Sequence, residues 1–189
     1  MKRIIPILIA SLLPFIVAAQ FDNLVPVQVV SVFDGDGCRA KFCDTCEAVA
    51  IRFIGIDAPE RRGYSLKGQP YGDIAGDTLR KWIKGKTLLF DTLSNKGANQ
   101  RDYYGRLIAE PYFADSSSVC FALVESGLAW YVYQGNRRQP GFNRVLETAF
   151  DEARAAKRGL WASYLNKDGK VARIYKPSTH RRKFSINKR

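Results

Sequence analysis

The chain has 189 residues, a length that favours one folded domain with a small appendage. Hydrophobic residues make up 46% and charged residues 25% of the sequence, which excludes a disordered polyelectrolyte and a protein with several membrane spans. The 30 Lys and Arg residues outnumber the 18 Asp and Glu residues, and the net charge of +12 favours a polyanionic partner such as nucleic acid.

The N-terminal segment over residues 1–19 has the pattern of a secretory signal peptide. Two basic residues precede an apolar run from Ile4 to Val17, which is short for a membrane span and is interrupted by two prolines. Val17 and Ala19 suit the small-residue rule for cleavage before Gln20. We therefore expect export to a secreted or a periplasmic or envelope location, with no membrane span after cleavage. An uncleaved membrane anchor is the alternative.

Strands are expected in the first part of the mature chain. β-branched and aromatic residues predict a strand over 25–33, and shorter strands over 38–42 and 47–56 follow it as a three-stranded meander. Two further strands are expected over 86–92 and 106–109.

Helices are expected between and after these strands. Apolar residues recur at helical spacing over 75–83, 119–126 and 142–160. This order of elements favours an α+β fold, a small closed or partly open antiparallel barrel with helices packed on it. The barrel and its helices are expected to form a single domain over 20–164.

A basic tail follows over 165–189. It contains nine Lys or Arg residues and a single acid, Asp168, with little hydrophobic periodicity. We expect a solvated extension that adds electrostatic affinity for a polyanion and takes no part in the chemistry.

The four cysteines are Cys38, Cys43, Cys46 and Cys120. An even number of cysteines in an exported chain predicts disulfides with no remaining thiol, and Cys43 with Cys46 is a plausible local pair. The spacing also resembles the ligand patterns of a plant-type iron–sulfur cluster and of a zinc site. The distant fourth cysteine and the single closely spaced pair argue against both metal centres.

Acidic motifs carry the candidate chemistry. With His180 as the only histidine, acid–base work falls to carboxylates, tyrosines or lysines. The turn from Asp34 to Gly37 places two carboxylates on one side of an extended chain, and the segment from Asp57 to Glu60 follows a strand that looks buried. Hard carboxylate oxygens suit Ca²⁺ or Mg²⁺ better than metals that prefer soft ligands.

Two arginines accompany these carboxylates. Arg52 lies on an apolar strand face, where a guanidinium needs a carboxylate or a phosphate as its partner. Arg106 stands at the mouth of a strand, at the end of the motif that begins at Asp102. Because arginines suit phosphate, the acidic and basic motifs together predict a phosphodiester-cleaving site.

Six motifs in this order resemble the staphylococcal nuclease (thermonuclease) family over about residues 25–161. The motifs are Val32-Phe33-Asp34-Gly35-Asp36, Ile51-Arg52-Phe53-Ile54-Gly55-Ile56-Asp57-Ala58-Pro59-Glu60, Pro70-Tyr71-Gly72, Asp102-Tyr103-Tyr104-Gly105-Arg106-Leu107, Gly127-Leu128-Ala129-Trp130 and Lys157-Arg158-Gly159-Leu160-Trp161. The resemblance implies an OB-fold, a five-stranded Greek-key barrel with three packed helices. It also implies a calcium-dependent endonuclease that hydrolyses DNA and RNA. We expect a monomer without a stable protein partner.

The resemblance implies a metal site as well. Asp36 and Asp57 would bind one Ca²⁺ together with the backbone carbonyl of Ala58, and Asp34 would lie behind these ligands. Gly37 stands where the family usually has threonine, which removes a hydroxyl near the metal. Some members also have threonine where Ala58 stands, a change that a carbonyl ligand tolerates.

The remaining implied roles concern the substrate. Arg52 and Arg106 would grip the phosphate and stabilise the charge that grows on it. Glu60 would hold or deprotonate the attacking water, and Tyr104 and Tyr133 would line the nucleotide pocket.

A catalytically silent OB-fold module that binds single-stranded nucleic acid is the alternative function. Such a module would be expected to lose Glu60 or one of the two arginines, and the sequence retains all three. A basic protein that binds the surface of the envelope would explain the charge and none of the motifs.

Overall fold

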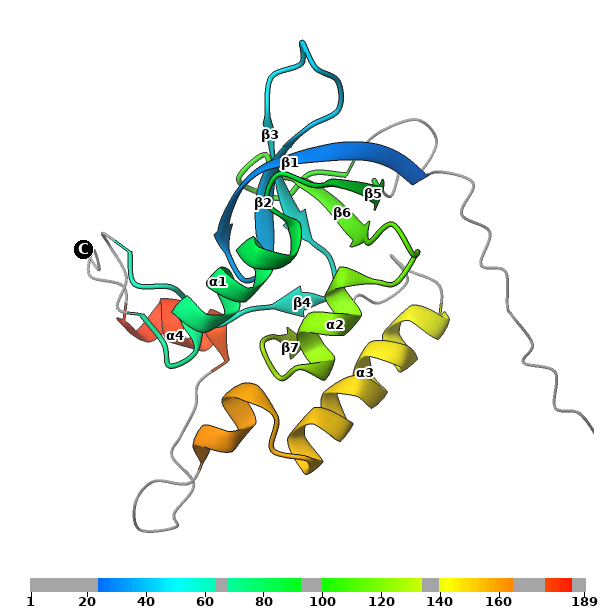
Figure 1. Cartoon of the computed structure of the whole chain (residues 1–189). Helices are drawn as coiled ribbons and strands as arrows, with labels where there is room; N and C mark the ends of the chain where they lie inside the picture. The colour runs from blue at the N-terminus through cyan, green and yellow to red at the C-terminus, as the bar shows by residue number, and fades with distance from the viewer. Residues whose placement is uncertain (1–23, 64–67, 93–99, 134–139, 165–175, 185–189) are drawn as a thin grey trace, which may run out of the picture.

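The computed structural model describes residues 24–63, 68–92, 100–133, 140–164 and 176–184. A closed five-stranded barrel, with strand order β1-β2-β3-β6-β5, forms its centre (Figure 1). These strands are β1 (Leu24–Asp34), β2 (Gly37–Lys41), β3 (Val49–Phe53), β5 (Thr87–Asp91) and β6 (Leu107–Tyr112). The barrel with its helices confirms the predicted α+β fold.

The alternation of side chains along β1 reflects how the barrel closes around its core. Val27, Val29 and Val32 are buried, and the residues between them are exposed or partly exposed. Val29 and Val32 can both face inward only if the strand carries an extra residue, and the pairing with β2 shifts its register between them. The bulged strand leads directly into the acidic turn that begins at Asp34.

One pair of neighbouring strands in the barrel is parallel. β3 and β6 run in the same direction, with Ile51 opposite Leu107 and Phe53 opposite Ala109, while the other four pairs are antiparallel. The expectation of an antiparallel barrel is therefore wrong for this pair. Parallel neighbours need a long connection, and here it contains α1 (Gly72–Ile83) and β5.

The third expected strand, over 47–56, is divided in two. After β3 the chain breaks, and β4 (Ile56–Asp57) pairs with β7 (Trp130–Tyr131) in a separate two-stranded sheet. Gly55 lies at the break with a φ of 77°, and a Cβ there would meet the ring of Phe142 at 2.7 Å. The prediction of one continuous strand is wrong because this backbone conformation and this close approach both favour glycine.

Three helices cover the barrel in two layers: α1 and α2 (Val119–Glu125) pack on its strands, and α3 (Pro140–Ala155) packs on α2. α1 contacts β1, while α2 contacts both β6 and α3. The third helix, expected over 142–160, is shorter than predicted. Lys157 has a φ of 53°, which lies outside the range of a right-handed helix, so the helix cannot continue through this residue. A 3-10 helix over Gly159–Tyr164 follows.

A fourth helix, α4 (Pro177–Phe184), lies within the region 165–189 that the sequence assigns to a basic tail. The rest of that tail and the predicted signal peptide over 1–19 lie outside the described residues. Within the described ranges, no helix is long and apolar enough to cross a bilayer.

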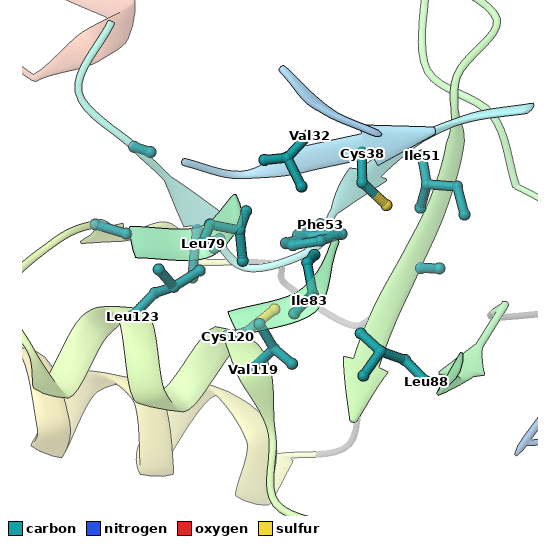
Figure 2. Packing of buried hydrophobic residues seen from close by; sticks show 14 of the residues in the cluster. Val32, Cys38, Ile51, Phe53, Leu79, Ile83, Leu88, Val119, Cys120 and Leu123 are labelled. Carbon is teal, nitrogen blue, oxygen red and sulfur yellow. The ribbon is translucent and has the colours of Figure 1, made fainter. Parts of the chain in front are cut away.

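The four cysteines divide into a linked pair and a buried pair. A disulfide joins Cys43 to Cys46 in the connection between β2 and β3, with 5.1 Å between the Cα atoms. Cys38 and Cys120 lie as thiols in the core, and Figure 2 shows Phe53 between them in the view. The expectation that no thiol remains is wrong for these two cysteines, because each packs among core side chains on its own element.

Candidate active site

Three separate elements bring charged side chains together at the edge of the barrel. Asp36 comes from the turn between β1 and β2, Arg52 from β3 and Asp57 from β4. Nη1 of Arg52 forms an ion pair with Asp36, and Nη2 donates to Oδ1 of Asp57 at 2.8 Å and to the carbonyl of Ile56 at 3.0 Å. One guanidinium therefore bridges the two aspartates that the family resemblance implies as metal ligands.

The glycine in the acidic turn has a packing role. A Cβ on Gly35 would lie 2.6 Å from the Cβ of Ala58 and 2.8 Å from the Cβ of Ala75 in α1. This close approach allows the backbone N–H of Ala58 to donate to Oδ2 of Asp36 at 2.7 Å. The backbone N–H of Asp36 donates to Oδ1 of Asp34 at 3.3 Å, so the first aspartate of the turn orients the second.

Burial dominates the electrostatics of this cluster. Asp36 is 2% exposed and Asp57 is 6% exposed. Burial raises the pKa of Asp36 well above its ordinary value, Arg52 opposes that shift, and the charges of Asp34 and Asp57 add to it. The mutual repulsion of Asp34, Asp36 and Asp57 would be relieved by a bound cation.

Glu60 lies just beyond Asp57, in a loop held against α1. Its backbone N–H donates to Oε1 of Gln69 at 3.0 Å, and its carbonyl accepts from the backbone N–H of Gln69 at 2.8 Å. A Cβ on Gly72 would lie 2.1 Å from the same carbonyl oxygen, so only glycine fits at the start of α1. Burial raises the pKa of Glu60 although the neighbouring Arg181 lowers it.

Arg181 of α4 completes the group of charges. Its guanidinium donates to both carboxylate oxygens of Asp57 at 3.3 Å and forms an ion pair with Oε1 of Glu60. Figure 1 shows α4 beside the segment that follows β4, in agreement with these contacts. No local pattern in the sequence singles out Arg181 as a residue of this site.

Arg106 is placed on the site's side of the barrel without joining the carboxylate cluster. The parallel pairing sets Arg52 opposite Ile108, so Arg106, two residues earlier in the chain, shares that face. Nε of Arg106 donates to Oδ2 of Asp102 at 2.7 Å, and its guanidinium lies 5.7 Å from the centre of the Tyr104 ring.

The two tyrosines predicted to line the nucleotide pocket are exposed. Tyr104 is 79% exposed, and its ring meets that of Tyr103 edge to face with 5.4 Å between the centroids. Tyr133 is 69% exposed and follows β7, where the N–H of Val132 donates to the carbonyl of Gly55. Neither ring is held by core packing, so both are available to a ligand.

Comparison with known proteins identifies the relatives of this chain. Residues 50–163 match a family model described as "Staphylococcal nuclease homologue". The chain belongs to the staphylococcal nuclease family. It is a nuclease, an enzyme that hydrolyses phosphodiester bonds.

Individual relatives support this assignment. An uncharacterized endonuclease of Escherichia coli is 36% identical over 135 residues, covering 71% of this chain and 76% of the relative. Endonuclease YncB of Bacillus subtilis is 31% identical over 142 residues, covering 74% of this chain and 63% of the relative. The staphylococcal-like nuclease CAN1 of Arabidopsis thaliana is 33% identical over 113 residues, covering 60% of this chain and 29% of the relative.

The donor atoms of this nuclease fit a hard divalent cation. Asp36 and Asp57 supply buried carboxylate oxygens, and Ala58 is held against Asp36 by its backbone N–H. In the part of the chain that the structure describes, no three Asp, Glu, His or Cys side chains are grouped to hold a metal ion. A cation here would therefore rely on two carboxylates completed by backbone carbonyl and water oxygens.

Gly37 departs from the family pattern for a reason that the structure supplies. A Cβ at this position would lie 3.0 Å from the carbonyl oxygen of Ile51 and 3.4 Å from Oδ1 of Asp34. In this nuclease β2 and β3 approach each other closely at the site, and a threonine there would have to move one of them.

Proposed function

We propose that this nuclease is an exported, calcium-dependent enzyme that hydrolyses DNA and RNA at the site around Arg52. The observation that supports this most directly is the bridging of Asp36 and Asp57 by one guanidinium, with Glu60 beside them. Two close carboxylates repel each other unless cations join them. Hydrolysis of a phosphodiester uses the same combination of a cation, an arginine and a general base.

The chain's own residues account for the chemical step. Ca²⁺ held by Asp36, Asp57 and the carbonyl of Ala58 would supply charge that polarises the phosphate. Arg52 contacts a phosphate oxygen through the N–H groups that Asp36, Asp57 and Ile56 do not engage, and it stabilises the charge that develops as phosphorus becomes five-coordinate. Glu60 accepts the proton of the attacking water, whose oxygen bonds to phosphorus as the bond to the leaving sugar oxygen breaks, and the leaving oxygen takes a proton from solvent water. The raised pKa of Glu60 lies closer to the pH at which the enzyme works, which suits a general base.

The exposed side chains around the site suit a nucleic-acid strand. Tyr104 and Tyr133 offer ring faces on which bases can stack, and stacking tolerates every base. Arg106 lies beside Tyr104 and supplies a second guanidinium for the phosphate. Together with the net charge of +12, these features support a substrate range that includes both DNA and RNA.

Calcium is the preferred ion in this proposal. The ligands are hard oxygens, and the turn that carries Asp36 contains two glycines, Gly35 and Gly37. Ca²⁺ accepts variable numbers of oxygen ligands in flexible geometry, whereas Mg²⁺ demands a near-ideal octahedron. Mg²⁺ is therefore expected to bind and to support slower hydrolysis.

The test uses the purified mature chain from Gln20 onward, with single-stranded DNA and RNA as separate substrates. We expect hydrolysis of both polymers with Ca²⁺, slower hydrolysis with Mg²⁺ and none with a chelator. Undiminished hydrolysis in the chelator contradicts the role of the cation, and hydrolysis of only one polymer contradicts the substrate range. N-terminal sequencing of protein recovered from outside the cytoplasm tests export, with Gln20 as the expected first residue.

A further inference from the structure

The C-terminal helix places a cation on the carboxylates of the site. Arg181 donates to both oxygens of Asp57 and forms an ion pair with Glu60, although it lies more than a hundred positions further along the chain. The side chains of Asp57 and Glu60 are 8% and 17% exposed, while that of Arg181 is 44% exposed. The arginine thus reaches the site from the solvent side.

One face of α4 carries this contact. Pro177, His180 and Arg181 are separated by three and four positions and lie on the same side of the helix. Pro177 and His180 are buried, whereas Ser178 and Arg182 are exposed. The helix is therefore docked by the face that delivers Arg181.

A divalent cation and Arg181 need the same oxygen atoms. Both oxygens of Asp57 accept from the guanidinium, so a cation bound to either oxygen would lie close to a like charge. Arg52 also contacts Asp57, but Arg52 extends from a barrel strand and forms an ion pair with Asp36 as well. Arg181 is the cation that can leave without opening the barrel.

We propose that α4 is an autoinhibitory plug, in which Arg181 occupies Asp57 and Glu60 until a divalent cation displaces it. The inference rests on the proposed function, because it takes Asp57 as a ligand of the cation. Docked α4 holds the site in a form that binds the cation weakly and covers the general base. The apparent affinity for the cation equals the affinity of the open site multiplied by the fraction of molecules in which the site is open.

Calorimetric titration of Ca²⁺ alone into the metal-free mature protein tests the competition. Arg181→Gln is expected to bind Ca²⁺ roughly 5- to 100-fold more tightly than the unmodified chain, the usual size of a coupling between two sites. Arg182→Gln is the matched control, since it removes one charge from the exposed face of the same helix. Its affinity is expected to stay within about twofold of the unmodified chain, because an exposed charge is screened by solvent and salt.

The outcomes separate the plug from the calcium site. Equal Ca²⁺ affinities in the unmodified chain and Arg181→Gln overturn the plug and leave the calcium site standing. An equal gain in both variants also overturns the plug, because it shows a general effect of charge. Absence of Ca²⁺ binding in all three proteins overturns the calcium site and the plug together.

Hydrogen exchange of the unmodified chain provides a second readout. Saturating Ca²⁺ is expected to speed exchange of the backbone amides of α4, because the helix leaves the site, while β1 to β3 keep their protection. Protection of α4 that is unchanged or increased at saturating Ca²⁺ overturns the plug.

Discussion

Arg52 and Arg181 present the same chemical group to the same carboxylate from two different regions of the molecule. Arg52 extends from a barrel strand, its side chain is 20% exposed, and it bridges Asp36 and Asp57. Arg181 extends from a helix in the tail, is 44% exposed, and bridges Asp57 and Glu60. The first contact is part of the barrel and the second is added to it from outside.

The position of an arginine in the fold therefore decides its role at an acidic site. The burial of Arg52 opposes its charge, yet Asp36 and Asp57 raise its pKa above the ordinary value, so the guanidinium stays ionised. Losing Arg52 leaves a buried aspartate without its main counter-ion, which is strongly destabilising in proteins. Losing Arg181 leaves the carboxylates of Asp57 and Glu60 accessible to solvent or to a metal ion.

Glu60→Gln is expected to have the largest effect on activity. The variant keeps the shape of the side chain and removes the proposed base, so turnover should fall by roughly 10²- to 10⁴-fold. It also weakens the docking of Arg181, so Ca²⁺ affinity should be kept or increased. Initial rates on single-stranded DNA check the first point, with the exposed α3 residue Glu152→Gln as the control. A rate for Glu60→Gln close to that of the control contradicts the proposed mechanism.

Lysine substitutions compare the two arginines directly. Arg52→Lys keeps the charge but loses the planar fork, and we expect turnover to fall by about 10²-fold. Arg181→Lys is expected to change turnover at saturating Ca²⁺ by less than about twofold, because the plug has been displaced. Rates measured for both variants at saturating Ca²⁺ and substrate check the contrast. Equal losses in the two variants would show that Arg181 belongs to the catalytic machinery.

The packing that fixes Asp36, the partner of Arg52, can be tested through glycine. Gly35→Ala forces a Cβ to within 2.6 Å of the Ala58 Cβ, and such overpacking costs about 1–3 kcal/mol of unfolding free energy. Gly63→Ala is the control, because a Cβ there meets no atom within 4 Å. Urea unfolding of both variants measures the difference. Similar stabilities would mean that the acidic turn relaxes without cost.

A third arginine, Arg106, extends the comparison to a partly buried pair with Asp102 and gives the smallest expected effect. Burial raises the pKa of Asp102, but hydrogen bonds from Arg106 and from the backbone N–H of Tyr104 lower it below the ordinary value. A lowered pKa in the folded state means stabilisation that is present at neutral pH and is lost as the pH falls. Asp102→Asn should therefore cost less than about 1 kcal/mol at pH 7.

The pH dependence of this cost provides the check. Urea unfolding of Asp102→Asn and the unmodified chain between pH 7 and pH 3 should show a stability gap that narrows as the pH falls. A gap that widens toward acid pH contradicts the role of the Asp102 to Arg106 pair.

Local signals in the sequence predicted the centre of the site. Asp36 lies in a glycine turn after a strand, Asp57 follows a strand directly, and Arg52 lies on a strand face where it needs a partner. Each of these features depends on neighbouring residues, whereas the meeting of the three at the barrel edge was implied only by the family resemblance. The break at Gly55 could not be predicted, because it depends on the approach of Phe142 from α3.

Contacts between distant segments account for the rest of what the sequence did not predict. The parallel pairing of β3 with β6 follows from the closure of the whole barrel. Cys38 and Cys120 remain thiols because core packing surrounds each of them, which an even count of cysteines does not reveal. Pro177 suits the first turn of a helix, but no local pattern shows that this helix brings Arg181 to Asp57.

The rate of hydrolysis as a function of free Ca²⁺ tests whether the site around Asp36 and Asp57 needs a cation. The mature chain is mixed with single-stranded DNA in buffers that fix free Ca²⁺ from chelator levels to saturation. We predict no hydrolysis at the lowest level and a rate that rises to a plateau, since Asp36 and Asp57 need a cation for the reaction. A rate that is independent of free Ca²⁺, with full activity in the chelator, would rule out a cation at Asp36 and Asp57 as part of the reaction.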